Sequence, residues 1–183
     1  MALTVEDGTC IATANALVTR AEYIAWMADF YPAVTVGNDT TTDGAIMRAS
    51  SWVSTYPDWD GTMKCGRGLQ GLAFPRTGVT DCNGDAVPDD EVPSEVKQAT
   101  YLATSAELTL AGVLTPTITP GQQVKRIKVD VIEQEFMTPV DQKAASAPNP
   151  VETLRPMLTA VNDLLKCLGS MPDGMNVPWP WVA

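Results

Sequence analysis

Apolar and polar side chains alternate along this chain mostly with a helical period. In residues 19–31 the apolar positions recur every three or four residues, which predicts a short amphipathic helix. Thr19 followed three positions later by Glu22 matches a capping box, in which each side chain bonds the backbone of the other residue. Residues 40–56 repeat the spacing up to Pro57, so a second helix is expected there.

Two more helices are expected later in the chain. Pro93 opens an alanine-rich stretch with one apolar face, and Gly112 is its expected terminator. The many alanines on that face indicate that another helix approaches it closely. Leucine and valine then recur at spacings of four and three from about residue 153 to Gly169, which predicts the last helix.

The period changes to two in residues 124–136, where apolar residues alternate with charged ones as in a strand with one buried face. A single strand is unstable, so this one is expected to pair with residues 61–88 or with another subunit. Within that partner region, residues 79–87 are expected to form a hairpin. Asn83 and Gly84 would supply the positive φ angles of a type I′ turn.

These elements predict a mainly α fold: a small helical bundle with an inserted β-hairpin and strand and an extended C-terminal arm. We expect a core at residues 1–137, an exposed linker at 138–150, and a C-terminal helix with its arm at 151–183. The arm carries Trp179 and Trp181 between prolines, so it is expected to dock on another chain. Folding back over its own domain is the alternative.

Charge narrows the expected function. The 183 residues include 22 acidic and 12 basic side chains, and the net charge of −10 argues against nucleic-acid binding by the surface as a whole. The longest basic cluster is Lys125, Arg126 and Lys128. The absence of histidine excludes serine and cysteine nucleophiles activated by imidazole, and zinc sites that use it.

The four cysteines, Cys10, Cys65, Cys82 and Cys167, are scattered and form no Cys-x-x-Cys pair. This spacing favours reduced thiols in a protein made inside the cell over a disulfide framework. The N-terminus lacks a signal-peptide pattern, and no apolar run approaches the roughly 20 residues that span a bilayer. A soluble protein that is not exported by the usual route is expected.

Trp52, Tyr56 and Trp59 could form a stacking platform for single-stranded bases. Such a platform needs positive charge beside it, whereas the neighbours here are Asp58 and Asp60. Packing in the core or between subunits is therefore favoured over base stacking.

The acidic stretch after residue 80 suggests two chemical alternatives. Asp81, Asn83 and Asp85 match the first ligand positions of an EF-hand, but Ala86 and Val92 replace the bend glycine and the closing glutamate. A carboxylate enzyme is the other alternative, although catalytic pairs normally converge from separate elements. A solvated acidic loop is favoured, with no metal, no cofactor, no catalytic residue and no enzymatic activity.

One long segment resembles a known family. An aromatic-Pro-Arg-Thr-Gly motif precedes an acidic turn, and a Val-Pro dipeptide then opens an alanine-rich helix. The residues concerned are Gln70 to Val79, Asp81, Gly84, Val87, Val92, Pro93, Val96 and Ala99. This pattern resembles the phage family called "DnaT-like", whose members are similar to head-to-tail connector (adaptor) proteins of tailed bacteriophages.

The resemblance implies a structural adaptor in the virion, at the head–tail junction, made in the host cytoplasm. It implies a homo-oligomeric ring, usually of twelve copies, that joins the portal protein to a tail or head-closure protein. Double-stranded DNA would only pass through the channel, and no membrane would be involved. The alternative is a single-stranded DNA-binding replication accessory protein.

Residue roles follow from the adaptor hypothesis. Portal docking is expected from the last helix and the arm, through Leu158, Leu165, Trp179 and Trp181. Inter-subunit contact or loop pinning is expected from a second group, Phe74, Pro75, Arg76, Trp52 and Trp59.

Overall fold

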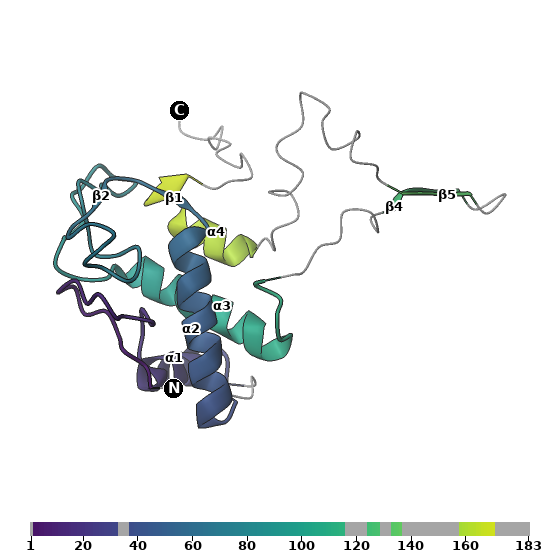
Figure 1. The fold of residues 1–183 in the computed structure, drawn as a ribbon, viewed down its shortest axis with the longest axis horizontal. Helices are drawn as coiled ribbons and strands as arrows, with labels where there is room; N and C mark the ends of the chain where they lie inside the picture. The colour runs from purple at the N-terminus through teal and green to yellow at the C-terminus, as the bar shows by residue number, and fades with distance from the viewer. Residues whose placement is uncertain (1, 33–36, 116–123, 129–132, 137–157, 171–183) are drawn as a thin grey trace. The chain divides into compact units, whose positions relative to one another are not determined.

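A computed structural model describes residues 2–32, 37–115 and 158–170, together with the backbone of 124–128 and 133–136 (Figure 1). The chain divides into two units, one formed by residues 1–114 with 157–183 and the other by residues 115–156. The division expected from composition, at residues 137 and 150, lies outside the described residues and stays a prediction. The helices are α1 Arg20–Phe30, α2 Asp39–Thr55, α3 Ser94–Thr109 and α4 Thr159–Leu165, all in the first unit.

Helix α1 begins as predicted. The Thr19 hydroxyl accepts from the Glu22 amide at 3.1 Å, and the Glu22 carboxylate accepts from the Thr19 amide at 2.7 Å, which confirms the capping box. Tyr23 and Met27 are buried, but Ile24 and Phe30 stay exposed. The apolar face of α1 is therefore only partly covered by its own unit.

Helix α2 begins earlier than predicted, because Asn38 is its N-cap and accepts from the Thr41 amide at 3.0 Å. Ile46, Ala49 and Val53 are completely buried, which confirms the predicted apolar face. Packing against α3 covers this face.

Helix α3 follows Pro93, which lies at the N-cap position rather than inside the first turn. Val96, Ala99 and Ala103 are completely buried, as the alanine-rich pattern predicts, whereas Leu110 lies beyond the helix and is 64% exposed. Helix α4, in the same unit, packs on α3. Its seven residues begin after the predicted start near residue 153, a position outside the described residues.

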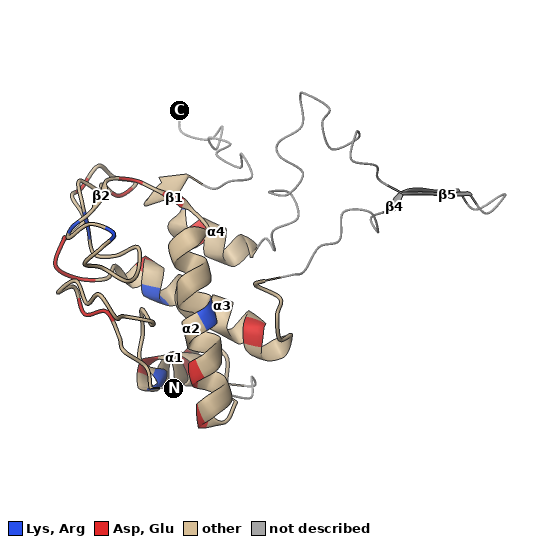
Figure 2. Ribbon diagram, in the orientation of Figure 1, with Lys and Arg blue, Asp and Glu red and all other residues tan. Residues whose placement is uncertain are grey.

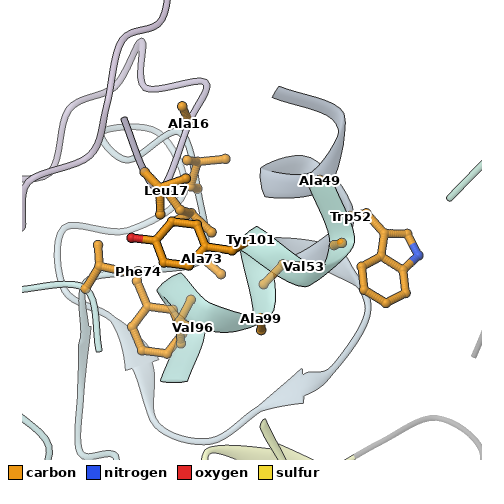
Figure 3. Packing of buried hydrophobic residues seen from close by; sticks show 14 of the residues in the cluster. Ala16, Leu17, Ala49, Trp52, Val53, Ala73, Phe74, Val96, Ala99 and Tyr101 are labelled. Atoms are coloured by element: carbon orange, nitrogen blue, oxygen red, sulfur yellow. The ribbon is translucent and has the colours of Figure 1, made fainter. Parts of the chain in front are cut away.

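The core lies between the helices and also takes in side chains from the loops. Phe74, from the segment after α2, belongs to the same buried cluster as Val96 of α3, and both are labelled in Figure 3. Leu17 and Ala16, from the segment before α1, belong to the same cluster. Long loops are thus anchored by apolar side chains that enter the helical core.

Residues 57–92 contain only very short strands. Strand β1 (Asp58–Trp59) pairs antiparallel with β6 (Gly169–Ser170), and β2 (Thr62–Met63) pairs with β3 (Arg76–Thr77). The hairpin at 79–87 is present as a bridge between Thr80 and Ala86. Its turn differs from the type I′ prediction, because only Gly84 has a positive φ, +88°, while Asn83 does not.

Strands β4 (Val124–Lys128) and β5 (Glu133–Phe136) form an antiparallel hairpin in the second unit. The expectation that this stretch is one strand pairing with residues 61–88 or another subunit is wrong, since its two halves pair with each other. The register places Arg126 opposite Glu135 and Lys128 opposite Glu133.

The expectation of reduced thiols is also wrong. Disulfides join Cys10 to Cys65 and Cys82 to Cys167, with Cα–Cα distances of 6.1 and 4.9 Å. The paired cysteines lie 55 and 85 positions apart, so only the fold reveals which of them are neighbours. Within the part of the chain that the structure describes, no helix combines the length and apolar character needed to cross a bilayer.

Candidate nucleic-acid interface

A cleft of about 600 Å³ opens between the end of α2 and the loops that follow it. We call it the Trp59 cleft. Aromatic, basic and polar side chains line it together, among them Trp59, Arg67, Arg76, Ser54, Asp58 and Gln70.

Trp59 is half-buried in the wall of this cleft. Its indole N–H donates to the Ser54 carbonyl at 3.2 Å, and its ring meets Phe74 edge-on, with centroids 4.8 Å apart and planes at 90°. The buried Phe74 therefore fixes the orientation of the indole from behind. The exposed part of Trp59 is a rigid aromatic surface facing the cleft.

Arg67 lies at the tip of the loop on one side of the cleft. Its neighbours are Gly66, which has a φ of +75°, and Gly68, and a Cβ at either glycine would meet no atom within 4 Å. Among the described residues, Arg67 has neither an ion pair nor a hydrogen bond. Its charge is therefore available to a ligand.

Arg76 has a different environment. Its guanidinium donates to the carbonyls of Asp60 and Gly61, both at 2.8 Å, and less closely to those of Ala73 and Trp59, both at 3.4 Å. Burial lowers the pKa of Arg76, while the Asp58 and Asp60 carboxylates act in the opposite direction. Arg76 ties the loops together, and its N–H groups are occupied by backbone carbonyls.

The buried side chain of Gln70 completes the cleft. Its amide nitrogen donates to the carbonyls of Pro75, at 2.9 Å, and Leu72, at 3.0 Å, while its oxygen accepts from the Cys65 amide at 3.4 Å. Neither Gln70, which entered only as part of the family-like motif, nor Arg67 was predicted to be a site residue. A glutamine between glycine-rich segments carries no signal of burial, so the tertiary structure was needed to find it.

The other basic side chains of this unit have acidic partners. Lys64 pairs with Asp89 at 3.2 Å, and Arg48 pairs with Glu107 at 2.7 Å. Figure 2 shows how sparse the basic residues are, with some of them in the loops near β2. The unpaired charge of Arg67 distinguishes the Trp59 cleft from these neutralised positions.

Two buried carboxylates are structural and were not predicted. The Glu107 side chain, 1% exposed, accepts from the amides of Gly112, at 2.9 Å, and Leu114, at 3.3 Å, in addition to Arg48. Burial alone would raise its pKa, but these hydrogen bonds and the guanidinium hold the pKa of Glu107 below its usual value. The buried Glu6 carboxylate likewise accepts from backbone amides.

In the acidic turn after residue 80, the Asp81 carboxylate accepts hydrogen bonds from the backbone of the turn itself. One Asp81 oxygen accepts from the amides of Asn83, at 2.8 Å, and Asp85, at 2.9 Å. Those bonds lower the pKa of Asp81, the Asp85 amide having the larger effect. No group of three or more acidic or cysteine side chains within the described ranges is arranged to hold a metal ion.

The remaining predicted site residues lie apart from the cleft or behind it. Trp52 and Tyr56 stack with centroids 4.3 Å apart and are buried, so their rings are not an open platform. Leu165 is completely buried within its own unit, Leu158 is partly buried, and Pro75 is buried behind the cleft. Trp179 and Trp181 lie outside the described residues.

Comparison with known proteins tests the adaptor hypothesis. A family described as "Putative DnaT-like ssDNA binding protein" matches residues 1–176. No curated protein and no solved structure matches the chain.

The match overturns the connector hypothesis together with the partners it implied. A virion adaptor forming a twelve-membered ring on a portal is wrong for this chain, because the family is described as binding single-stranded DNA. The net charge of −10 argues against binding by the surface as a whole, but a single total does not describe the local groups of one cleft. The match covers nearly the whole chain, and the protein belongs to this family of DnaT-like ssDNA-binding proteins.

Proposed function

We propose that this protein binds single-stranded DNA, with the Trp59 cleft as the binding site. Membership of the ssDNA-binding family carries the proposal. The cleft supports it, because it combines a half-buried tryptophan with an unpaired arginine. Base stacking on aromatic rings and attraction of phosphates by basic groups are the two interactions that nonspecific ssDNA binding requires.

Stacking is the first step of the argument. An unpaired base can lie on the exposed part of the Trp59 indole, whose orientation is already fixed by Phe74 and by the hydrogen bond to Ser54. Because little side-chain freedom remains to be lost, the stacking energy is retained on binding. Such a contact contributes about 1–3 kcal/mol per base.

Phosphate contact is the second step. Arg67 can reach a phosphate beside the stacked base because its loop tip is exposed and its guanidinium has no partner among the described side chains. Arg76 already donates to four carbonyls, so it contributes mainly by holding the walls. The cleft therefore contacts about one or two phosphates, fewer than an extended basic groove.

The acidic surface sets the expected selectivity. A duplex presents its bases stacked and paired, so none of them is free to lie on Trp59, and its dense phosphate charge is repelled by a protein of net charge −10. A single strand can place one base in the cleft while its flanking phosphates point to solvent. Single-stranded DNA should thus bind more tightly than a duplex of the same length.

Fluorescence anisotropy with a labelled oligo-dT tests the proposal. With one or two phosphates contacted, affinity should fall only about 3- to 7-fold between 50 and 200 mM salt. Trp59→Ala should weaken binding by about 1–3 kcal/mol. Arg67→Ala should weaken it less and flatten the salt dependence.

Matched controls separate the site from general effects. Phe30→Ala removes an aromatic ring that is 65% exposed elsewhere, and Lys166→Ala removes the same charge as Arg67→Ala; neither should change the affinity. Absence of oligo-dT binding by the wild-type protein contradicts the proposed function. Binding that is insensitive to Trp59 and Arg67 keeps the function but moves the site elsewhere, with the β4–β5 hairpin as the next candidate because it carries the longest basic cluster.

A further inference from the structure

The loop that carries Arg67, residues 64–69, is attached to the rest of the unit through a disulfide. Cys65, at the base of this Arg67 loop, is joined to Cys10, 55 positions earlier in the chain. Both cysteines are half-buried, so neither is enclosed in the core.

At the Cys10 end of the disulfide, the backbone is held by hydrogen bonds to a buried side chain. The buried Glu6 carboxylate accepts from the amides of Cys10, at 3.0 Å, and Ile11, at 2.8 Å. It also accepts from Gly8 at 3.1 Å, so three amides within residues 8–11 converge on one side chain. Cys10 is held by these bonds with a φ of +65°, the one positive value among the described residues other than glycine.

On its near side the Arg67 loop has few other attachments. Its first residue, Lys64, pairs with Asp89 at 3.2 Å, and the Lys64 amide donates to the Pro75 carbonyl at 3.2 Å. Beyond Lys64, the Gly66 amide donates to the Met63 carbonyl at 3.4 Å and the Leu69 amide to the Gly66 carbonyl at 3.1 Å. The Cys65 amide reaches Gln70 only at 3.4 Å. Side chains at the tip do not replace these bonds, since Leu69 is 65% exposed.

Without the disulfide, the loop would be held mainly at its two ends. Strand β2 fixes the start, and Gly71, whose amide donates to the Ile11 carbonyl at 3.2 Å, fixes the end. Two glycines within the loop widen the range of conformations that its backbone can adopt. Arg67 would then spend less time beside Trp59, and ordering it on DNA would cost more free energy.

We propose that the Cys10–Cys65 disulfide is a redox-sensitive tether that keeps Arg67 at the Trp59 cleft, so that reduction weakens ssDNA binding. This inference rests on the proposed function. The reductant is a dithiol. One of its thiolates attacks a sulfur of the protein disulfide and forms a mixed disulfide, and its second thiolate then breaks this mixed disulfide and releases the protein thiol. Two electrons and two protons pass to Cys10 and Cys65, and the dithiol becomes a disulfide.

The first experiment measures the loop without DNA. Trypsin cleavage after Arg67 is followed by mass spectrometry in the oxidised C82S/C167S variant, whose single remaining disulfide is Cys10–Cys65, before and after dithiothreitol. We expect cleavage to become about tenfold faster on reduction, because proteolysis follows local opening of the loop. C10S/C65S, which keeps the other disulfide, should match the reduced protein, and circular dichroism confirms that each variant is folded.

The second experiment measures oligo-dT affinity for the same proteins. Reduced C82S/C167S and oxidised C10S/C65S should bind about 2- to 10-fold more weakly than oxidised C82S/C167S, owing to the cost of ordering the loop. In an Arg67→Ala background the redox effect on affinity should disappear.

The outcomes separate the two proposals. If oxidised wild-type protein does not bind oligo-dT, the proposed function fails, while a trypsin difference still establishes the tether. If oligo-dT binds equally well in both redox states, the redox inference is overturned and the proposed function stands. Equal cleavage rates in both states, or free thiols at Cys10 and Cys65 in the oxidised protein, also overturn it.

Discussion

The helices and the loop region at residues 57–92 are stabilised by different interactions. Helices α2 and α3 meet through completely buried aliphatic side chains such as Ile46, Val53 and Val96. The loop region has strands of only two residues and is held by polar side chains that bond backbone carbonyls, with Arg76 and Gln70 as the main examples. Apolar burial is spread over many contacts, whereas each of these hydrogen-bonding side chains holds several loop segments alone.

This difference explains why the candidate site lies in the loops. A helix packed in the bundle buries its apolar face and exposes mainly polar side chains to solvent. Loops held by a few internal polar side chains can leave an aromatic ring and an arginine partly free, as at Trp59 and Arg67.

The largest effect is expected where the loop region enters the helical core. Phe74→Ala removes a ring that is 1% exposed, so it should lower the free energy of unfolding by about 3–5 kcal/mol. Urea denaturation followed by circular dichroism measures the change. Leu69→Ala, at a position 65% exposed in the same region, should cost less than about 0.5 kcal/mol. Equal costs for the two variants would show that the loops are not anchored by Phe74.

The second effect concerns the buried carboxylate at the end of α3. Glu107→Gln should lower the free energy of unfolding at pH 7 by about 1–3 kcal/mol, because backbone amides lose a charged acceptor. Since folding lowers the pKa of Glu107, its contribution is complete above the unfolded value of about 4.5 and is lost as the pH falls through the folded value.

The pH dependence gives this prediction its test. Urea denaturation at several pH values should show the wild-type protein and Glu107→Gln converging in stability as the pH falls below 4.5. Glu95→Gln, at an exposed position in the first turn of α3, is the matched control and should change stability little. A constant difference between wild type and Glu107→Gln at all pH values would contradict the assigned role.

A smaller effect is expected from Arg76. Arg76→Lys keeps the charge but loses the planar fork that reaches the carbonyls of Asp60 and Gly61, so stability should fall by about 1–2 kcal/mol. Thermal denaturation measures this change. Arg67→Lys is the matched control and should leave the midpoint unchanged; a similar loss in both variants would mean that Arg76 does not hold the loops.

The smallest effect is expected at the helix cap. Thr19→Ala removes the acceptor for the Glu22 amide and should cost about 1 kcal/mol. Thr40→Ala, in the exposed first turn of α2, makes the same change at a position that caps no helix. Urea midpoints that shift equally would show that the capping box contributes nothing specific.

Local sequence patterns predicted the helices well. The capping box at Thr19 and the buried positions Ile46, Ala49 and Val53 were read correctly, because both depend on residues a few positions apart. The turn at residues 81–84 was predicted with the wrong type, since the positive φ is at Gly84 alone. The strand at 124–136 was assigned the wrong partner, because residues 124–128 pair with residues 133–136 of the same stretch.

The candidate site was the least predictable part. Trp59 was singled out and then assigned to packing, because Asp58 and Asp60 stand beside it in the sequence. In the fold those carboxylates oppose the charge of Arg76, which leaves Arg67 as the free cation of the cleft among the described residues. The net charge could not reveal this arrangement, since it does not record which charges are neighbours.

The amino-acid order by itself determined the capping box of α1, the buried faces of α2 and α3, and the breaks at proline, since these arise from interactions within one or two turns of chain. The tertiary structure alone decided the disulfide pairs, the buried bonds of Glu107 and Gln70, and the presence of Trp59 and Arg67 in the lining of one cleft. These contacts join residues that are distant in sequence or depend on backbone groups of irregular loops, so no local periodicity encodes them.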